Sequence, residues 1–125
     1  MESWTLTDGA APMSADTVTE VLRSRIAAGK LDTWLESASG RSLAVVSNTE
    51  RAMVMLLELP GDPGEHAADP GADADGWSDG FELSNGQCDE YPDTDTVPLD
   101  EAFRIVHHIL ATGRPPADAA WVVDR

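Results

Sequence analysis

The stretch from Gly80 to Trp121 constrains the fold more than any other part of this chain, because it predicts two strands, a loop and a helix in a fixed order. In the helix, apolar residues recur at i, i+3, i+4 and i+7, a spacing that places them on one face. They are Leu99, Ala102, Phe103, Val106, Ile109 and Leu110. Gly113 is a typical helix end, and the double proline after it prevents the helix from continuing. The rest of the chain must therefore supply an apolar surface for this helix to cover.

The two strands before this helix are predicted to form a hairpin. Asn85-Gly86 is a strong turn signal, because a type I′ turn needs positive φ at both central residues. Residues 81–84 and 87–91 flank it and can pair with each other. Pro98 is predicted at the start of the helix, where the first N–H groups have no partner within the helix and the missing N–H of proline costs no hydrogen bond. The acids after it suit the positive end of the helix dipole.

The first half of the chain predicts a helix and several strands. Ser14 is a good N-cap for an amphipathic helix that ends near Ala28, before Gly29. Residues 51–59 are nearly all apolar, which favours a central strand buried on both faces, although Met, Ala and Leu also suit a helix. The other strands are expected at residues 3–7, 31–37, 42–47 and 120–123.

These elements predict a single α+β domain over residues 1–125. We expect one small antiparallel sheet of about five or six strands with two helices packed on it. Residues 60–76, rich in Gly, Pro, Ala and Asp, interrupt the pattern. A loop of this length is uncommon in a compact domain and is commonly functional or mobile, so we expect a mobile acidic loop there.

The charge of the chain is strongly acidic and unevenly distributed. It has 23 acids against 8 Lys and Arg, for a net charge of −15, and residues 52–103 hold 14 of the acids and no Lys or Arg. Such a surface repels nucleic acid and anionic membranes and attracts basic partners. A surface that served only solubility would more often mix its signs. The asymmetry therefore favours a binding face for a basic protein.

Two aromatic residues lie among these acids. Trp77 stands between Asp75 and Asp79, and Tyr91 follows Glu90. An aromatic anchor surrounded by charge is a common pattern at the centre of a protein interface. The predicted partner-binding residues are Asp73, Asp75, Trp77, Asp79, Asp89, Glu90, Tyr91, Asp93 and Asp95.

The last third of the chain also resembles a known protein family. The strand that ends in Asn85-Gly86, the acidic-aromatic segment, the run VPLDEA at 97–102, the run TGRPP at 112–116 and the closing Trp121 are similar to the immunity proteins of bacterial polymorphic toxin systems. The group that they resemble is the one numbered first, here called Imm-one. The resemblance implies a small cytoplasmic antitoxin that binds a cognate toxin domain, a nuclease or a deaminase, and blocks it.

A calcium loop is a weaker alternative. With Gly76 at loop position six, Asp73, Asp75, Asp79 and Glu82 fall at ligand positions three, five, nine and twelve. Position one, where an acid is required, is Gly71, and no predicted helix precedes the loop. Chance explains the match better, and we expect no metal site.

Nothing in the sequence predicts an enzyme. Cys88 is flanked by acids that disfavour its thiolate form, and the neighbouring His107 and His108 point about 100° apart on a helix, so they cannot easily share one metal. Motifs for phosphate loops, zinc proteases and nucleophile elbows are missing. We therefore expect no catalytic residues and no cofactor.

The remaining expectations concern compartment and mode of binding. The chain has no long apolar run and no basic, apolar start, and its single cysteine cannot form an internal disulfide, so we expect a cytoplasmic protein with no membrane segment. The alternative to an immunity protein is a non-enzymatic adaptor that binds a peptide along a sheet edge.

Overall fold

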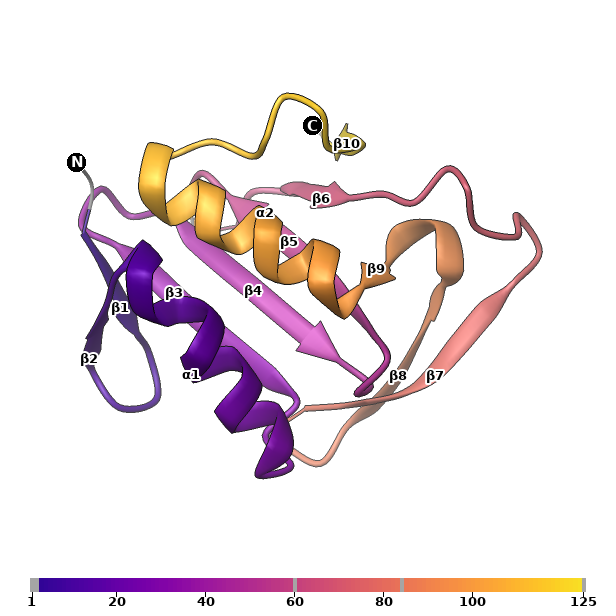
Figure 1. The fold of residues 1–125 in the computed structure, drawn as a ribbon, viewed down its shortest axis with the longest axis horizontal. Helices are drawn as coiled ribbons and strands as arrows, with labels where there is room; N and C mark the ends of the chain where they lie inside the picture. The colour runs from indigo at the N-terminus through magenta and orange to yellow at the C-terminus, as the bar shows by residue number, and fades with distance from the viewer. Residues whose placement is uncertain (1–2, 60, 84, 125) are drawn as a thin grey trace.

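The structure, a computed structural model, describes residues 3–59, 61–83 and 85–124. Both helices lie on the same side of one twisted sheet, and a hairpin extends at the end of the molecule away from the N-terminus (Figure 1). The elements in chain order are β1 Trp4–Leu6, β2 Ala11–Met13, α1 Ala15–Ala27, β3 Asp32–Ser37, β4 Ser42–Ser47, β5 Arg51–Leu57, β6 Glu65–Ala67, β7 Trp77–Glu82, β8 Cys88–Pro92, the 3-10 turn η1 Asp93–Asp95, β9 Val97–Pro98, α2 Leu99–Thr112 and β10 Trp121–Val123.

The main sheet confirms the α+β class but has more strands than expected. Eight antiparallel strands follow the order β10-β6-β5-β4-β3-β1-β2, with β9 also paired to β5. The expectation of five or six strands was wrong because β2, β6 and β9 span only two or three residues each. A strand that short shows no alternating pattern in the sequence.

The hairpin of β7 and β8 forms a separate two-stranded sheet, so the prediction of a single sheet was also wrong. Its turn differs from the expected type I′. Gly86 has φ +89°, and its N–H donates to the Leu83 carbonyl at 2.9 Å. Ser84, the last residue of the strand predicted over 81–84, lies outside the described residues. The Leu83 N–H also donates to the Gln87 carbonyl at 2.8 Å, so the turn is longer than two residues.

The core lies between the helices and one face of the sheet. On β5, Ala52, Val54 and Leu56 are buried on this face and pack with the apolar stripe of α2. Met53 and Met55 point to the other face and are only half-buried, so the expectation that this strand is buried on both faces was wrong. Burial of β5 is complete only where the helices cover the sheet.

The two helices begin and end as predicted. Gly113 has φ +83°, the left-handed conformation that glycine adopts without strain, and it caps α2. Ser14 and Thr17 form a capping box at the start of α1. Phe103 of α2 is buried, and the guanidinium of Arg23 from α1 lies 5.3 Å from its ring centroid, which ties the two helices together.

The segment expected as one loop over residues 60–76 is interrupted by β6, which joins the main sheet between β5 and β10. Ala67 of β6 is fully buried, and backbone bonds join Ala68 to Ala120 and Asp69 to Thr94. The acids of this segment are thus fixed at one end by a strand. No helix in the described part of the chain is long and apolar enough to cross a membrane.

Candidate functional site

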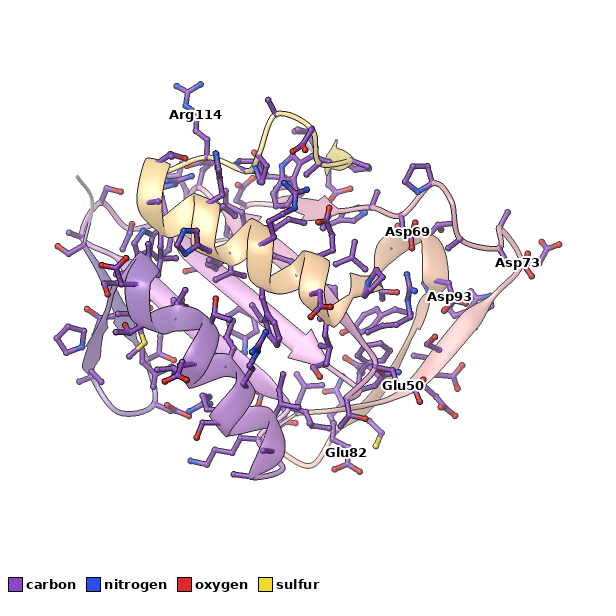
Figure 2. All side chains as sticks on the ribbon, in the orientation of Figure 1. Glu50, Asp69, Asp73, Glu82, Asp93 and Arg114 are labelled. Carbon is purple, nitrogen blue, oxygen red and sulfur yellow. The ribbon has the colours of Figure 1, made fainter. Side chains whose placement is uncertain are left out.

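The acidic segment is anchored by Arg51, the last base before the span that lacks Lys and Arg. Its guanidinium donates to the Asp69 carboxylate at 2.7 Å, to the Asp93 carbonyl at 3.2 Å, and to the carbonyl and hydroxyl of Thr96 at 2.9 and 2.8 Å. These bonds hold the start of the 69–76 loop against the turn after β8. Figure 2 shows Asp69 and Asp93 close together at the inner side of this loop.

Four of the predicted partner-binding residues are half-buried and engaged within the molecule. The Tyr91 hydroxyl donates to the Asp89 carboxylate at 2.9 Å, and Gln87 donates to the same carboxylate at 2.7 Å. The Ser78 hydroxyl donates to Asp93. Asp95 lies 3.1 Å from Nε2 of His66. These groups fix the shape of the segment.

The other five predicted residues are exposed. Trp77 is 63% exposed on β7, and Asp73, Asp75, Asp79 and Glu90 surround it along the loop and the hairpin. Within the described residues, no hydrogen bond or ion pair engages the carboxylates of Asp75, Asp79 or Glu90, and the Asp73 carboxylate accepts only a backbone N–H of its own loop. Figure 2 shows Asp73 pointing away from the body of the molecule.

Side chains alternate across the hairpin, which separates the two groups. Phe81 and Tyr91 point inward and meet edge to face with centroids 4.9 Å apart, whereas Trp77, Glu82 and Glu90 point outward. Glu82 was not among the predicted residues, because a strict alternation along β7 places it on the face opposite to Trp77, and the register shift between Ser78 and Phe81 breaks that alternation. We call the outward set the acidic outer surface; its members are Asp73, Asp75, Trp77, Asp79, Glu82 and Glu90.

The pKa of Tyr91 reflects the packing of this hairpin. Its burial, followed by the hydrogen bond and the negative charge of Asp89, raises the pKa of the Tyr91 phenol from its ordinary value of 10.0 to about 12. All three effects disfavour the phenolate. The residue is therefore a structural support on the inner side of the hairpin, and Trp77 is the exposed aromatic residue of the pair predicted to contact a partner.

The calcium-loop match does not fold as a calcium loop. Asp79 and Glu82 lie along the extended strand β7, whereas Asp73 and Asp75 lie in the turn before it. Among the described residues, no group of three or more His, Cys, Asp or Glu is placed to hold a metal ion.

The histidines make internal contacts. Both ring nitrogens of His66 face carboxylates, with Nδ1 2.7 Å from Asp124 and Nε2 3.1 Å from Asp95, so neither is open to a substrate. Nδ1 of His107 lies 2.8 Å from the Ala15 carbonyl, and Nδ1 of His108 lies 2.7 Å from the Arg114 carbonyl. These contacts secure β6, α1 and the end of α2.

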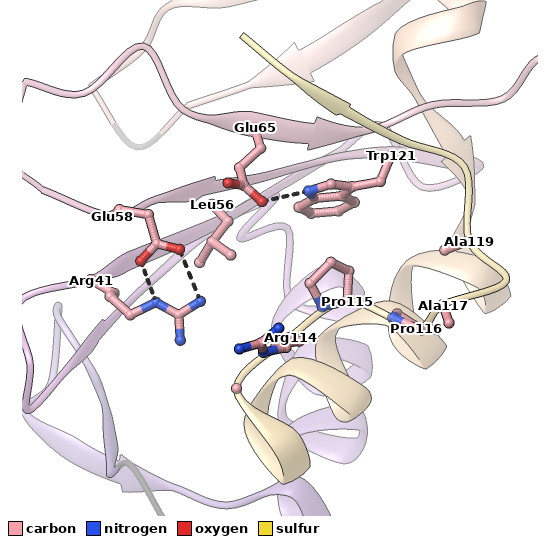
Figure 3. Close-up of a pocket in the computed structure, with 11 residues that line it drawn as sticks. Arg41, Leu56, Glu58, Glu65, Arg114, Pro115, Pro116, Ala117, Ala119 and Trp121 are labelled. Carbon is pink, nitrogen blue, oxygen red and sulfur yellow. Dashed lines mark hydrogen bonds and ion pairs between the residues drawn. The ribbon is translucent and has the colours of Figure 1, made fainter. Parts of the chain in front are cut away.

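A hollow of about 640 Å³ lies at the end of α2 (Figure 3). Arg41 donates to Glu58 through Nε at 2.9 Å and Nη2 at 3.4 Å, and the Trp121 indole donates to Glu65 at 2.6 Å. Pro115 and its neighbours close one side. Arg41 and Glu58 therefore pair with each other, whereas no side-chain contact to the Arg114 guanidinium is found among the described residues. Sequence patterns did not indicate this hollow, because its residues come from distant parts of the chain.

The comparisons with known proteins give no relative whose function could be transferred, so any inference about function rests on the residues and fold of this chain. No model of a known protein family matches the sequence, and no curated protein matches it. The class defined by the fold and the site is a small α+β protein with an organised acidic surface around an exposed tryptophan.

Proposed function

We propose that this protein is a non-enzymatic inhibitor that binds a basic toxin domain, in the manner of a polymorphic-toxin immunity protein. The observation that carries the proposal is the acidic outer surface. Its carboxylates have few or no internal partners, and a tryptophan 63% exposed lies among them. Exposed like charges repel one another, and a basic partner relieves that repulsion.

The class of partner follows from electrostatics and from the resemblance described above. Enzymes that act on nucleic acid line their clefts with Lys and Arg, which contact phosphates. An acidic surface with an aromatic centre can occupy such a cleft in place of the phosphates. A nuclease or a deaminase fits this description, and the binding protein acts in the same compartment as the toxin, the cytoplasm.

A peptide-binding adaptor is the second candidate. Strand β10 forms one edge of the main sheet, and Val122 and Val123 are 40% and 55% exposed. An extended peptide can add to such an edge through main-chain hydrogen bonds. The strand is only three residues long, which limits the number of such bonds.

Gene neighbourhood and co-expression test the proposal. We expect a toxin gene directly beside this one, and we expect the parent protein to protect cells that express the toxin domain and to co-purify with it. A toxin domain that kills equally well in the presence of this protein would contradict the proposal. A peptide that binds at β10, without any effect of the protein on the toxin, would favour the adaptor.

A further inference from the structure

The face of the sheet opposite the helices carries a groove that no sequence pattern indicated. The helices cover only one face, and the β7–β8 hairpin covers only part of the other (Figure 1). Where this cover ends, a shallow groove of about 270 Å³ remains. It is lined by Met53, Met55, His66, Tyr91 and Asp95.

Strand register explains why these side chains meet. Met55 on β5 lies opposite His66 on β6, and both point to the face away from the helices. The half-buried Tyr91 reaches the same place from the inner side of β8, where Phe81 and Asp89 hold its ring and hydroxyl. The floor is formed by paired strands and the wall by a locked aromatic ring, so the groove exists before any partner binds. A preformed site reduces the entropy lost on binding.

The chemistry of the lining points to an apolar side chain as the occupant. Two methionines and a tyrosine ring provide most of the lining, and methionine adapts to the shape of the group that it contacts. The charge at the rim is acidic, because the side chains of Asp95 and Asp124 are 47% and 37% exposed on either side of His66. An apolar residue flanked by Lys or Arg matches both features.

Net charge decides between the possible occupants. A second copy of this chain, or an anionic membrane, would bring negative charge against a molecule of −15. A basic protein gains from the same field. We infer that this groove receives an apolar anchor side chain, flanked by Lys or Arg, from the basic partner, and that Asp95 and Asp124 at the rim contact the flanking bases. The inference rests on the proposed function, since it takes the partner to be basic.

Methionine methyl NMR provides the test. Protein labelled at its methionine methyl groups is titrated with the peptide Lys-Lys-Phe-Lys-Lys and, separately, with Lys-Lys-Ala-Lys-Lys. We expect the phenylalanine peptide to shift the methyl signals of Met53 and Met55, and to bind about tenfold more tightly than the alanine peptide, because it buries its ring. Met13, on strand β2 at the far edge of the sheet, is the internal control and should not shift.

Two variants sharpen the test. Met55→Ala should reduce the affinity for the phenylalanine peptide to that for the alanine peptide. Leu57→Ala, on the same face of the same strand but outside the groove, should leave it unchanged. If Met55→Ala does not fold, the methyl shifts of the parent protein still decide the question.

The outcomes separate this inference from the proposed function. Equal binding of both peptides, or shifts that leave Met53 and Met55 unmoved, would overturn the groove and leave the acidic surface in place. Failure of both peptides to bind would also overturn it. Methyl shifts as expected, together with a toxin that is not inhibited, would support the groove and contradict the proposed function alone.

Discussion

At the scale of single residues, arginine side chains join segments of this acidic chain that are distant in the sequence. Arg51 is the clearest case, because one side chain contacts the loop after β6, the turn after β8 and Thr96. None of these contacts was predictable from the sequence, since Asp69 and Thr96 lie 18 and 45 positions away. Short-range sequence patterns predict helix caps and turns, but they do not predict contacts between residues that only the fold brings together.

The substitution Arg51→Met tests this role. It keeps the apolar stem and removes hydrogen bonds from a side chain that is 22% exposed, so we expect a loss of about 2–3 kcal/mol in the free energy of unfolding. The matched control is Arg104→Met, whose ion pairs to Glu101 and Asp118 lie on the surface, so its loss should be clearly smaller. Chemical denaturation measures both, and equal losses would contradict the assigned role of Arg51.

Tyr91 gives a pH-dependent prediction, because it is the only tyrosine. Its pKa is raised from 10.0 to about 12 in the folded protein, first by burial and then by Asp89. The protonated phenol therefore stabilises the fold below pH 10.0, and this contribution is lost as pH rises through about 12. We expect tyrosinate absorbance to rise near the higher value, and earlier in Asp89→Asn. A titration at the ordinary value, with circular dichroism showing the fold intact, would contradict the packing of this hairpin.

At the scale of elements, helices were predicted better than strands. The apolar stripe of α2 and its Gly113 cap are local signals, and the helix begins and ends where they place it. The hairpin was also predicted, but its separation from the main sheet was not. The hairpin instead packs against the rest of the molecule through residues distant in the sequence: the Asn48 side-chain amide donates to the Asp79 carbonyl at 3.0 Å, and Phe81 is fully buried.

The packing of α2 is tested by Phe103→Ala. The ring is 6% exposed between the helices and the sheet, so we expect a loss of about 3–5 kcal/mol on chemical denaturation. Leu59→Ala, at a side chain that is 67% exposed, should change stability very little. A loss below about 1 kcal/mol for Phe103→Ala would mean that the helix does not pack as described.

At the scale of the whole molecule, charge and shape act together. The sequence indicated nine partner-binding residues, and the structure divides them into an exposed set and a set with internal contacts. The sequence could not make this division, because the partners of Asp93 and Asp95 are a serine 15 positions away and a histidine 29 positions away. The mobility of the loop expected over residues 60–76, of which Pro60 lies outside the described residues, and the identity of the partner remain predictions.

The division improves the design of the central test. Neutralising Asp73, Asp75, Asp79 and Glu90 to Asn or Gln removes exposed charge from one surface without breaking an internal ion pair. The matched control neutralises four exposed acids elsewhere, namely Asp16, Glu20, Glu36 and Asp100. Both variants have the same net charge, so a difference between them reports the position of the charge.

The most direct measurement is the association rate with the purified toxin domain over a salt series from about 0.02 to about 0.5 M, where screening becomes strong. We predict that the parent rate falls at least about tenfold as salt rises. The surface variant should start about tenfold slower at low salt and vary little, whereas the control should stay close to the parent. If the two variants lose rate equally, or if both associate as the parent does at every salt, the acidic outer surface is not the binding face.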